Sequence, residues 1–117
     1  MSRRANLAGK RRWTKYGNAR TEFDGITFDS KGEAGRWQEL KLLERAGQIT
    51  DLRRQVTYRL DVNGLHVCRY VADFAYTDAQ AEPVTEDYKG VLTPACRIKL
   101  KLMRAIHGIE VRLVSKS

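Results

Sequence analysis

The residues best suited to chemistry lie in the triplet Asp87-Tyr88-Lys89. Side chains of a strand alternate between its two faces, so Asp87 and Lys89 point to one face and Tyr88 to the other. The carboxylate and the ammonium group are then about 6–7 Å apart along the strand, which is close enough for one site. The same alternation places Glu86 on the face away from Lys89, and Asp87 is therefore the preferred partner of the lysine.

A second carboxylate, Asp73, lies among apolar residues in the segment 71–75. A buried charge without a partner is unfavourable, so Asp73 needs a cation, a metal ion or a position at the rim. Carboxylates on adjacent strands offer the hard oxygen ligands that Mg²⁺ prefers, with Mn²⁺ as a substitute. Such an ion polarises a phosphate ester and activates water, and Lys89 would orient that water or stabilise the developing charge. We therefore expect Asp73 and Asp87 to be metal ligands in a phosphodiester-hydrolysing site.

The same residues also have a purely structural interpretation. Asp87 and Lys89 would then form an ordinary ion pair on an edge strand, and Asp73 would be a turn residue. An Asp-x-Lys triplet alone is common. An aspartate one hairpin upstream, an acidic helix before it and a basic helix after it together favour the site.

Glu33 is the third candidate for catalysis and metal binding. The sequence Ser30-Lys31-Gly32-Glu33 fits a capping box, in which Glu33 reaches back to the backbone N–H of Ser30. An acid in the first turn of a helix can also project over the end of a sheet and complete a metal shell. Both roles stay open.

The elements that must position these residues follow from hydrophobic periodicity and turn signals. We expect a hairpin over 21–28 turned at Asp24-Gly25, and a helix from Ser30 that ends at Gly47, with a core-facing stripe. Its members are Ala34, Trp37, Leu40 and Leu43 or Leu42. Strands follow over 55–62, 65–76 and 84–89, the first two joined at Asn63-Gly64. A helix over 94–107, with Thr93 as N-cap, precedes a last strand over 109–114. The fold class is α/β with a mixed sheet, in the order α-β-β-β-α-β, and residues 21–117 form a single domain.

Positive charge is concentrated at the start of the 117-residue chain. Residues 1–20 hold seven basic residues and no acid, whereas the remaining 97 residues carry 15 basic and 14 acidic ones. Such a basic N-terminal arm suits DNA, because each phosphate contact releases a condensed counterion. A solubilising tail or a localisation signal is the alternative. The candidate DNA-binding residues of the arm are Arg11, Arg12, Lys15 and Arg20.

A second basic surface is expected on the helix over 94–107. Arg97, Lys101 and Arg104 fall within about 60° of one another on a helical wheel and could follow a phosphate backbone. An ordinary solvated face is the alternative. Lys99 lies inside the apolar arc, so it either extends its ammonium group to solvent or reaches toward the active site.

Several classes are disfavoured by the sequence. No apolar run is long enough to span a membrane, and no apolar segment of a secretory signal follows the basic N-terminus. The two isolated cysteines fit a reduced, cytoplasmic setting better than a disulfide framework. Zinc spacing, a Ser/His/Asp or Cys/His nucleophile signature and a glycine-rich phosphate loop are all missing from the sequence.

Four segments together resemble a family of small phage and prophage proteins in the PD-(D/E)XK nuclease superfamily. This superfamily includes relatives of restriction endonucleases and of archaeal-type Holliday junction resolvases. The segments are 28–34, 40–47, 70–74 and 86–90, and the resemblance spans about residues 15–114, with Lys15-Tyr16-Gly17-Asn18 similar to the N-terminal motif of the family. It implies a mixed four-stranded sheet flanked by helices, as in restriction endonucleases, and a magnesium-dependent phosphodiesterase.

The resemblance also assigns residues. Asp73 matches the first aspartate of the motif, Asp87 its D/E position, Lys89 its lysine, and Glu33 the helical glutamate of many resolvase-like members. Gln55 is a weaker candidate for the pocket. Ala72 stands where the motif has proline, and Asp87 is shorter than the commoner glutamate, which reduces its reach and keeps its charge.

Our leading expectation is a metal-dependent endodeoxyribonuclease in the cytoplasm of a bacterial host, with branched DNA in phage replication or recombination as a candidate substrate. Cutting a junction needs two sites and hence a homodimer. A non-catalytic DNA-binding protein on the same fold is the alternative. An RNA-binding protein of ribosomal type would explain the charge and leave the acids unexplained.

Overall fold

The computed structural model describes residues 20–115, so the predicted basic arm lies outside the described residues except for Arg20. The chain divides into two compact units between Gly35 and Arg36. Each unit is described by itself below. The expectation of a single domain from residue 21 stays a prediction.

In the first unit, β1 (Thr21–Phe23) and β2 (Ile26–Phe28) form an antiparallel hairpin. Asp24 and Gly25 have φ values of 56° and 77°, the positive values that a type I′ turn requires. The predicted hairpin is therefore confirmed. After it, the hydroxyl of Ser30 accepts a hydrogen bond of 3.1 Å from the backbone N–H of Glu33, which confirms Ser30 as a helix N-cap.

Helix α2 (Lys31–Arg45) begins in the first unit and ends in the second. Gly47 has a φ of 79°, its N–H donates to the carbonyl of Glu44, and the N–H of Gln48 donates to that of Leu43. This pattern is a Schellman motif and ends the helix as predicted. Trp37 and Leu40 are buried, but Leu42 and Leu43 are exposed, so the predicted apolar stripe is wrong in its last turn.

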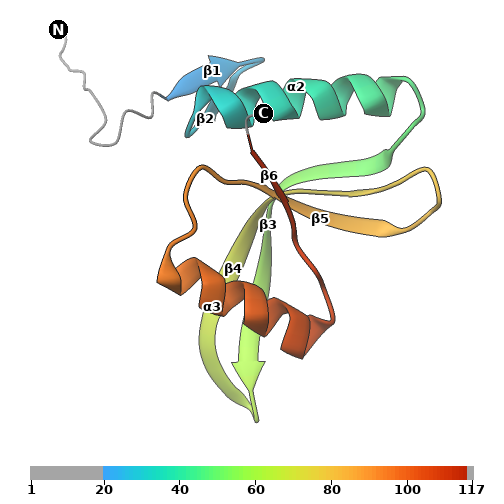
Figure 1. Cartoon of the computed structure of the whole chain (residues 1–117). Coiled ribbons are helices and arrows are strands. Elements are labelled where there is room, and N and C mark those ends of the chain that lie inside the picture. Colours follow the sequence, from blue (N-terminus) through green and yellow to red (C-terminus); the bar gives the residue numbers. More distant parts are fainter. Residues whose placement is uncertain (1–19, 116–117) are drawn as a thin grey trace, which may run out of the picture. The chain divides into compact units, whose positions relative to one another are not determined.

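The second unit is built on a four-stranded mixed sheet in the order β3-β4-β5-β6 (Figure 1). Its strands are β3 (Thr50–Val62), β4 (Leu65–Thr77), β5 (Pro83–Tyr88) and β6 (Arg112–Val114). Neighbouring strands run antiparallel, except that β5 and β6 are parallel. Helix α3 (Pro94–Leu102) and the π-helical turn η1 (Met103–His107) connect these two strands. With α2, this order confirms the predicted succession α-β-β-β-α-β and the mixed sheet.

Several predicted boundaries are corrected by the structure. Strand β3 begins at Thr50, five residues before Gln55, and β6 covers only Arg112–Val114. Ile109 and Val111 instead pack against the core cluster of Leu60, Tyr70, Ala72 and Met103. The predicted second helix is α-helical only to Leu102 and closes with a π-helical turn before Gly108, whose φ is 67°.

The core beside α3 joins that helix to the long β3–β4 hairpin (Figure 1). Its buried members are Leu60, Tyr70, Ala72 and Met103. Leu60 comes from β3, and Tyr70 and Ala72 lie two positions apart on one face of β4. At the start of α3, Thr93 accepts a hydrogen bond from the N–H of Cys96 at 3.1 Å, as predicted for its N-cap. This packing fixes α3 and η1 against β3 and β4, and β4 carries one of the predicted aspartates.

Candidate functional site

Strands β4 and β5 separate at the two predicted aspartates. Their ladder ends at the pair Phe74 and Glu86, so Asp73 and Asp87 stand directly beyond it. There the backbone N–H of Asp73 donates to Oδ1 of Asp87 at 2.7 Å, and the N–H of Tyr88 donates to Oδ2 of Asp73 at 2.9 Å. Each carboxylate therefore binds a backbone donor of the opposite strand where regular pairing stops. The structure brings Asp73 and Asp87 together, as the sequence predicted.

Asp87 is completely buried, and its second oxygen is also engaged. The hydroxyl of Tyr70 donates to Oδ2, and Nζ of Lys89 lies 3.6 Å from the same oxygen. Burial raises the pKa of Asp87 above its ordinary value, while the N–H of Asp73 and the charge of Lys89 lower it in part. The predicted partnership of Asp87 and Lys89 is confirmed. Tyr70 was missed, because only its core-facing position was visible in the sequence.

Lys89 follows β5 directly instead of lying within it, as the predicted strand over 84–89 would require. Its backbone N–H still donates to the carbonyl of Val114 at 2.9 Å, so β6 holds this residue in place. Its side chain is 32% exposed. The ammonium group can therefore contact Asp87 on one side and a ligand from solvent on the other.

Gln55, the weaker accessory candidate, is brought opposite Asp73 by the register of β3 and β4. The pairs Arg54–Phe74 and Val56–Ala72 flank this position on both sides. Gln55 has a φ of 56°, in the left-handed region that a strand residue does not normally adopt. Asp73 therefore has an irregularity on each side. On one side β3 has an unusual backbone conformation at Gln55, and on the other side the ladder with β5 ends.

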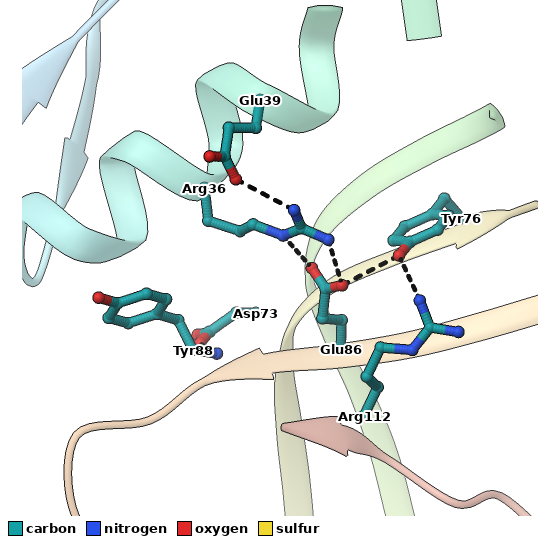
Figure 2. Close-up of polar contacts among 7 residues, drawn as sticks. All are labelled: Arg36, Glu39, Asp73, Tyr76, Glu86, Tyr88 and Arg112. Atoms are coloured by element: carbon teal, nitrogen blue, oxygen red, sulfur yellow. Dashed lines mark hydrogen bonds and ion pairs between the residues drawn. The ribbon is translucent and has the colours of Figure 1, made fainter. Parts of the chain in front are cut away.

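Glu86 belongs to a different cluster on the other face of β5, as the alternation of side chains predicted (Figure 2). It is fully buried, and Arg36 donates to both of its carboxylate oxygens at 2.9 and 2.8 Å. The hydroxyl of Tyr76 donates to it at 2.9 Å, and Arg112 reaches that hydroxyl at 3.4 Å. Glu86 raises the pKa of Arg36. This cluster joins α2, β4, β5 and β6 and is structural in character.

Sequence reasoning missed Arg36, although one signal was available. Arg36 adjoins the buried Trp37 on α2, and a buried acid elsewhere in the chain requires a cation of this kind. Without knowledge of the fold, fifty residues of separation from Glu86 hide the pair.

Asp73 and Asp87 are the carboxylates that a divalent ion would find at this point of the sheet. Within residues 20–115, no group of three or more His, Cys, Asp or Glu side chains is arranged to hold a metal. Glu33 is buried in the first unit, and its part in the site stays a prediction. Asp73 and Asp87 nevertheless present adjacent hard oxygen donors, and Mg²⁺ is often bound by one or two carboxylates with water and phosphate as its other ligands. Because burial raises the pKa of Asp87 despite Lys89, a further cation would relieve this carboxylate. Asp73 and Asp87 thus supply two of the carboxylate donors that such an ion would need.

The predicted DNA-binding residues are placed as follows. Arg97, Lys101 and Arg104 are exposed on α3 and η1, and Arg20 is exposed at the start of the described chain. Arg11, Arg12 and Lys15 lie outside the described residues. Lys99 is half-buried and lines a pocket together with Lys89, and both of its predicted roles stay predictions.

In the part of the chain that the structure describes, no helix is both long enough and apolar enough to cross a membrane.

Comparisons with known proteins place the chain in a family. Neither the curated proteins nor the solved structures gave a match. A family described as "Protein of unknown function (DUF1064)" matches residues 13–116, which is nearly the whole sequence. The chain therefore belongs to the DUF1064 family.

Proposed function

We propose that this protein is a metal-dependent endodeoxyribonuclease of the PD-(D/E)XK type. One observation carries the proposal: Asp73 and Asp87 meet where the ladder between β4 and β5 ends, with Nζ of Lys89 3.6 Å from Asp87. These are the residue types and the positions that the resemblance requires. Asp87 is fully buried with a raised pKa, and groups perturbed in this way are enriched at functional sites.

Each residue of the candidate site has a distinct role in the proposed reaction. Asp73 and Asp87 would hold Mg²⁺, which supplies Lewis-acid activation of a phosphate and of water. Tyr70 and the N–H of Asp73 fix the orientation of Asp87, so its carboxylate does not have to reorganise when substrate binds. Lys89 donates hydrogen bonds to the attacking water or to a non-bridging phosphate oxygen and stabilises the negative charge that develops there.

DNA is the proposed substrate because positive charge is concentrated in two parts of the chain. The chain has a net charge of +8, concentrated in residues 1–20, and Arg97, Lys101 and Arg104 are exposed on α3 and η1. Each phosphate contact of this kind contributes affinity that falls as salt rises. In its more specific form, the proposal is that the protein cuts branched DNA as a homodimer with two active sites.

The test is a substrate panel with purified full-length protein. Plasmid, linear duplex and four-way-junction DNA are incubated in Mg²⁺, in Mn²⁺ and in EDTA, with Asp87→Ala in parallel. We expect cleavage that needs the metal and is lost in the variant, with nicked or linearised plasmid as the sign of internal cutting. Cleavage of no substrate in either metal would contradict the proposal. Binding that EDTA leaves unchanged, without cleavage, would then identify the non-catalytic DNA-binding protein.

A further inference from the structure

A pocket of about 330 Å³ opens beside the candidate site. One wall is β4, which contributes Arg69 and Tyr70. Strand β5 pairs only with the end of β4, from Phe74 to Thr77, so in the described chain the earlier part of β4 is paired on one side alone, with β3. The pocket occupies the space that β5 leaves when it turns away. Its volume is within the range of small-ligand sites.

The other wall of the pocket is the segment that follows β5. Lys89 lies at its beginning, and Thr93, Cys96 and Lys99 come from the start of α3. The hydroxyl of Thr93 accepts from the N–H of Cys96, and a hydroxyl that accepts one hydrogen bond still has its own hydrogen to donate. This wall thus adds a donor and two ammonium groups.

The charges of the pocket have one sign. Arg69, Lys89 and Lys99 are all cations, and none of the described residues that line the pocket is acidic. Asp87 lies behind the wall, in contact with Tyr70 and Lys89, and compensates one of the three charges. Two positive charges remain for a ligand. Guanidinium and ammonium groups that converge in a concave site favour a phosphate oxyanion.

We propose that this pocket binds a phosphate group of DNA adjacent to the phosphate that is cleaved. Arg69 and Lys99 hold its oxygens, and Lys89 stands between this phosphate and the carboxylates. The inference rests on the proposed function for the identity of the substrate, but the binding of the phosphate group itself requires no catalysis. The group is either an internal phosphodiester or a 5′-terminal phosphate, and both present the same oxyanion chemistry.

Cys96 makes the pocket accessible to a direct test, because its side chain lines the wall and reports occupancy. The full-length protein in EDTA is treated with iodoacetamide, and the alkylation of each cysteine is followed by mass spectrometry. Cys68 is the internal control, because it is half-buried against the core beside α3 and is not a lining residue of the pocket. Three probes are added in turn at equal ionic strength: inorganic phosphate, an oligonucleotide with a 5′-phosphate and the same oligonucleotide without it.

We expect the phosphate-bearing probes to slow the alkylation of Cys96 by about threefold or more and to leave Cys68 unchanged. Lys99→Met keeps the apolar stem of the side chain and removes its charge, and it should abolish the protection, as should Arg69→Ala. Arg45→Ala, on the exposed end of α2, is the matched charge control and should retain it. Protection by both oligonucleotides indicates an internal phosphodiester, whereas protection only by the phosphorylated one indicates a terminal phosphate.

Two results would overturn the inference: Cys96 alkylated at the same rate with and without every probe, or protection that survives both Lys99→Met and Arg69→Ala. Its failure is distinct from that of the proposed function. A protein that cleaves DNA without protection of Cys96 is a nuclease that does not use this pocket. A protein that shows protection without cleavage has the phosphate site and lacks the activity.

Discussion

The backbone N–H of Asp73 donates to Oδ1 of Asp87 at 2.7 Å, across the point where β4 and β5 stop pairing. The two carboxylates are thereby held together by the backbone of the sheet, before any ligand is present. Tyr70 and Lys89 act on the other oxygen of Asp87. A site built in this way is preorganised. Burying the charge of Asp87 is unfavourable, and the raised pKa of this residue reflects that.

The first prediction concerns the loss of folding stability caused by burying the charge of Asp87, and how that loss depends on pH. Asp87→Asn should be more stable to heat than the wild type in EDTA at pH 7, because the variant buries no charge. The folded pKa of Asp87 is raised above its ordinary value of 3.8, so the folded wild type binds the proton more tightly than the unfolded chain and loses stability as pH rises through that pKa. The advantage of the variant should therefore be small below pH 3.8 and grow above it.

Thermal unfolding measured between pH 3 and pH 8 checks this prediction. Saturating Mg²⁺ should narrow the gap at pH 7, since an ion that binds only the folded wild type stabilises it. An Asp87→Asn variant that is less stable than the wild type across the whole range would show that the burial of this carboxylate carries no such cost.

The second prediction concerns the buried pair of Arg36 and Glu86. Arg36→Ala leaves Glu86 fully buried without its cation and should lower the free energy of unfolding by about 3 kcal/mol, the low end for such pairs because the arginine side chain is 20% exposed. Arg45→Ala, exposed on the same helix, should change it by less than about 0.5 kcal/mol. Urea denaturation measures both. Equal effects of the two variants would contradict a structural role for the pair.

The third prediction concerns the backbone of Gln55. An L-residue in the left-handed region costs about 1 kcal/mol or more, and glycine avoids this cost. Gln55→Gly should therefore match or exceed the wild type in stability, whereas Gln55→Val, with a branched side chain, should be less stable. Because Gln55 lies opposite Asp73, we also expect Gln55→Gly to cleave DNA more slowly. A glycine variant destabilised by the amount usual for a strand interior, about 0.5–1 kcal/mol, would refute the stated conformation.

The turns and helix caps are the parts of the fold that the sequence could predict. Turns at Asp24-Gly25 and Asn63-Gly64 need positive φ values, and asparagine, aspartate and glycine adopt them most readily. Ser30 and Thr93 cap helices through hydrogen bonds to residues three positions away. Such signals depend only on neighbouring residues, and they were sufficient for the order of the elements.

The alternation of strand side chains was sufficient for the pairing of Asp87 with Lys89. It could not show that β5 leaves β4 just beyond Glu86, because nothing in a single strand records where its neighbour departs. The pocket and the role of Arg69 follow from that departure and were missed for the same reason. The early start of β3 was hidden because Asp51 and Gln55, both with positive φ, interrupt its regular pattern.

The central claim is that Asp87 and Lys89 act together in one hydrolytic site, and rate constants of DNA cleavage in Mg²⁺ test it most directly. Asp87→Asn and Lys89→Ala should each lose about a hundredfold or more in rate, and the double variant should lose little beyond either single one, because groups that act as a unit are not additive. Glu110→Gln, at an exposed carboxylate, should keep the wild-type rate. Cleavage by Asp87→Asn at the wild-type rate, or losses that multiply in the double variant, would contradict the account.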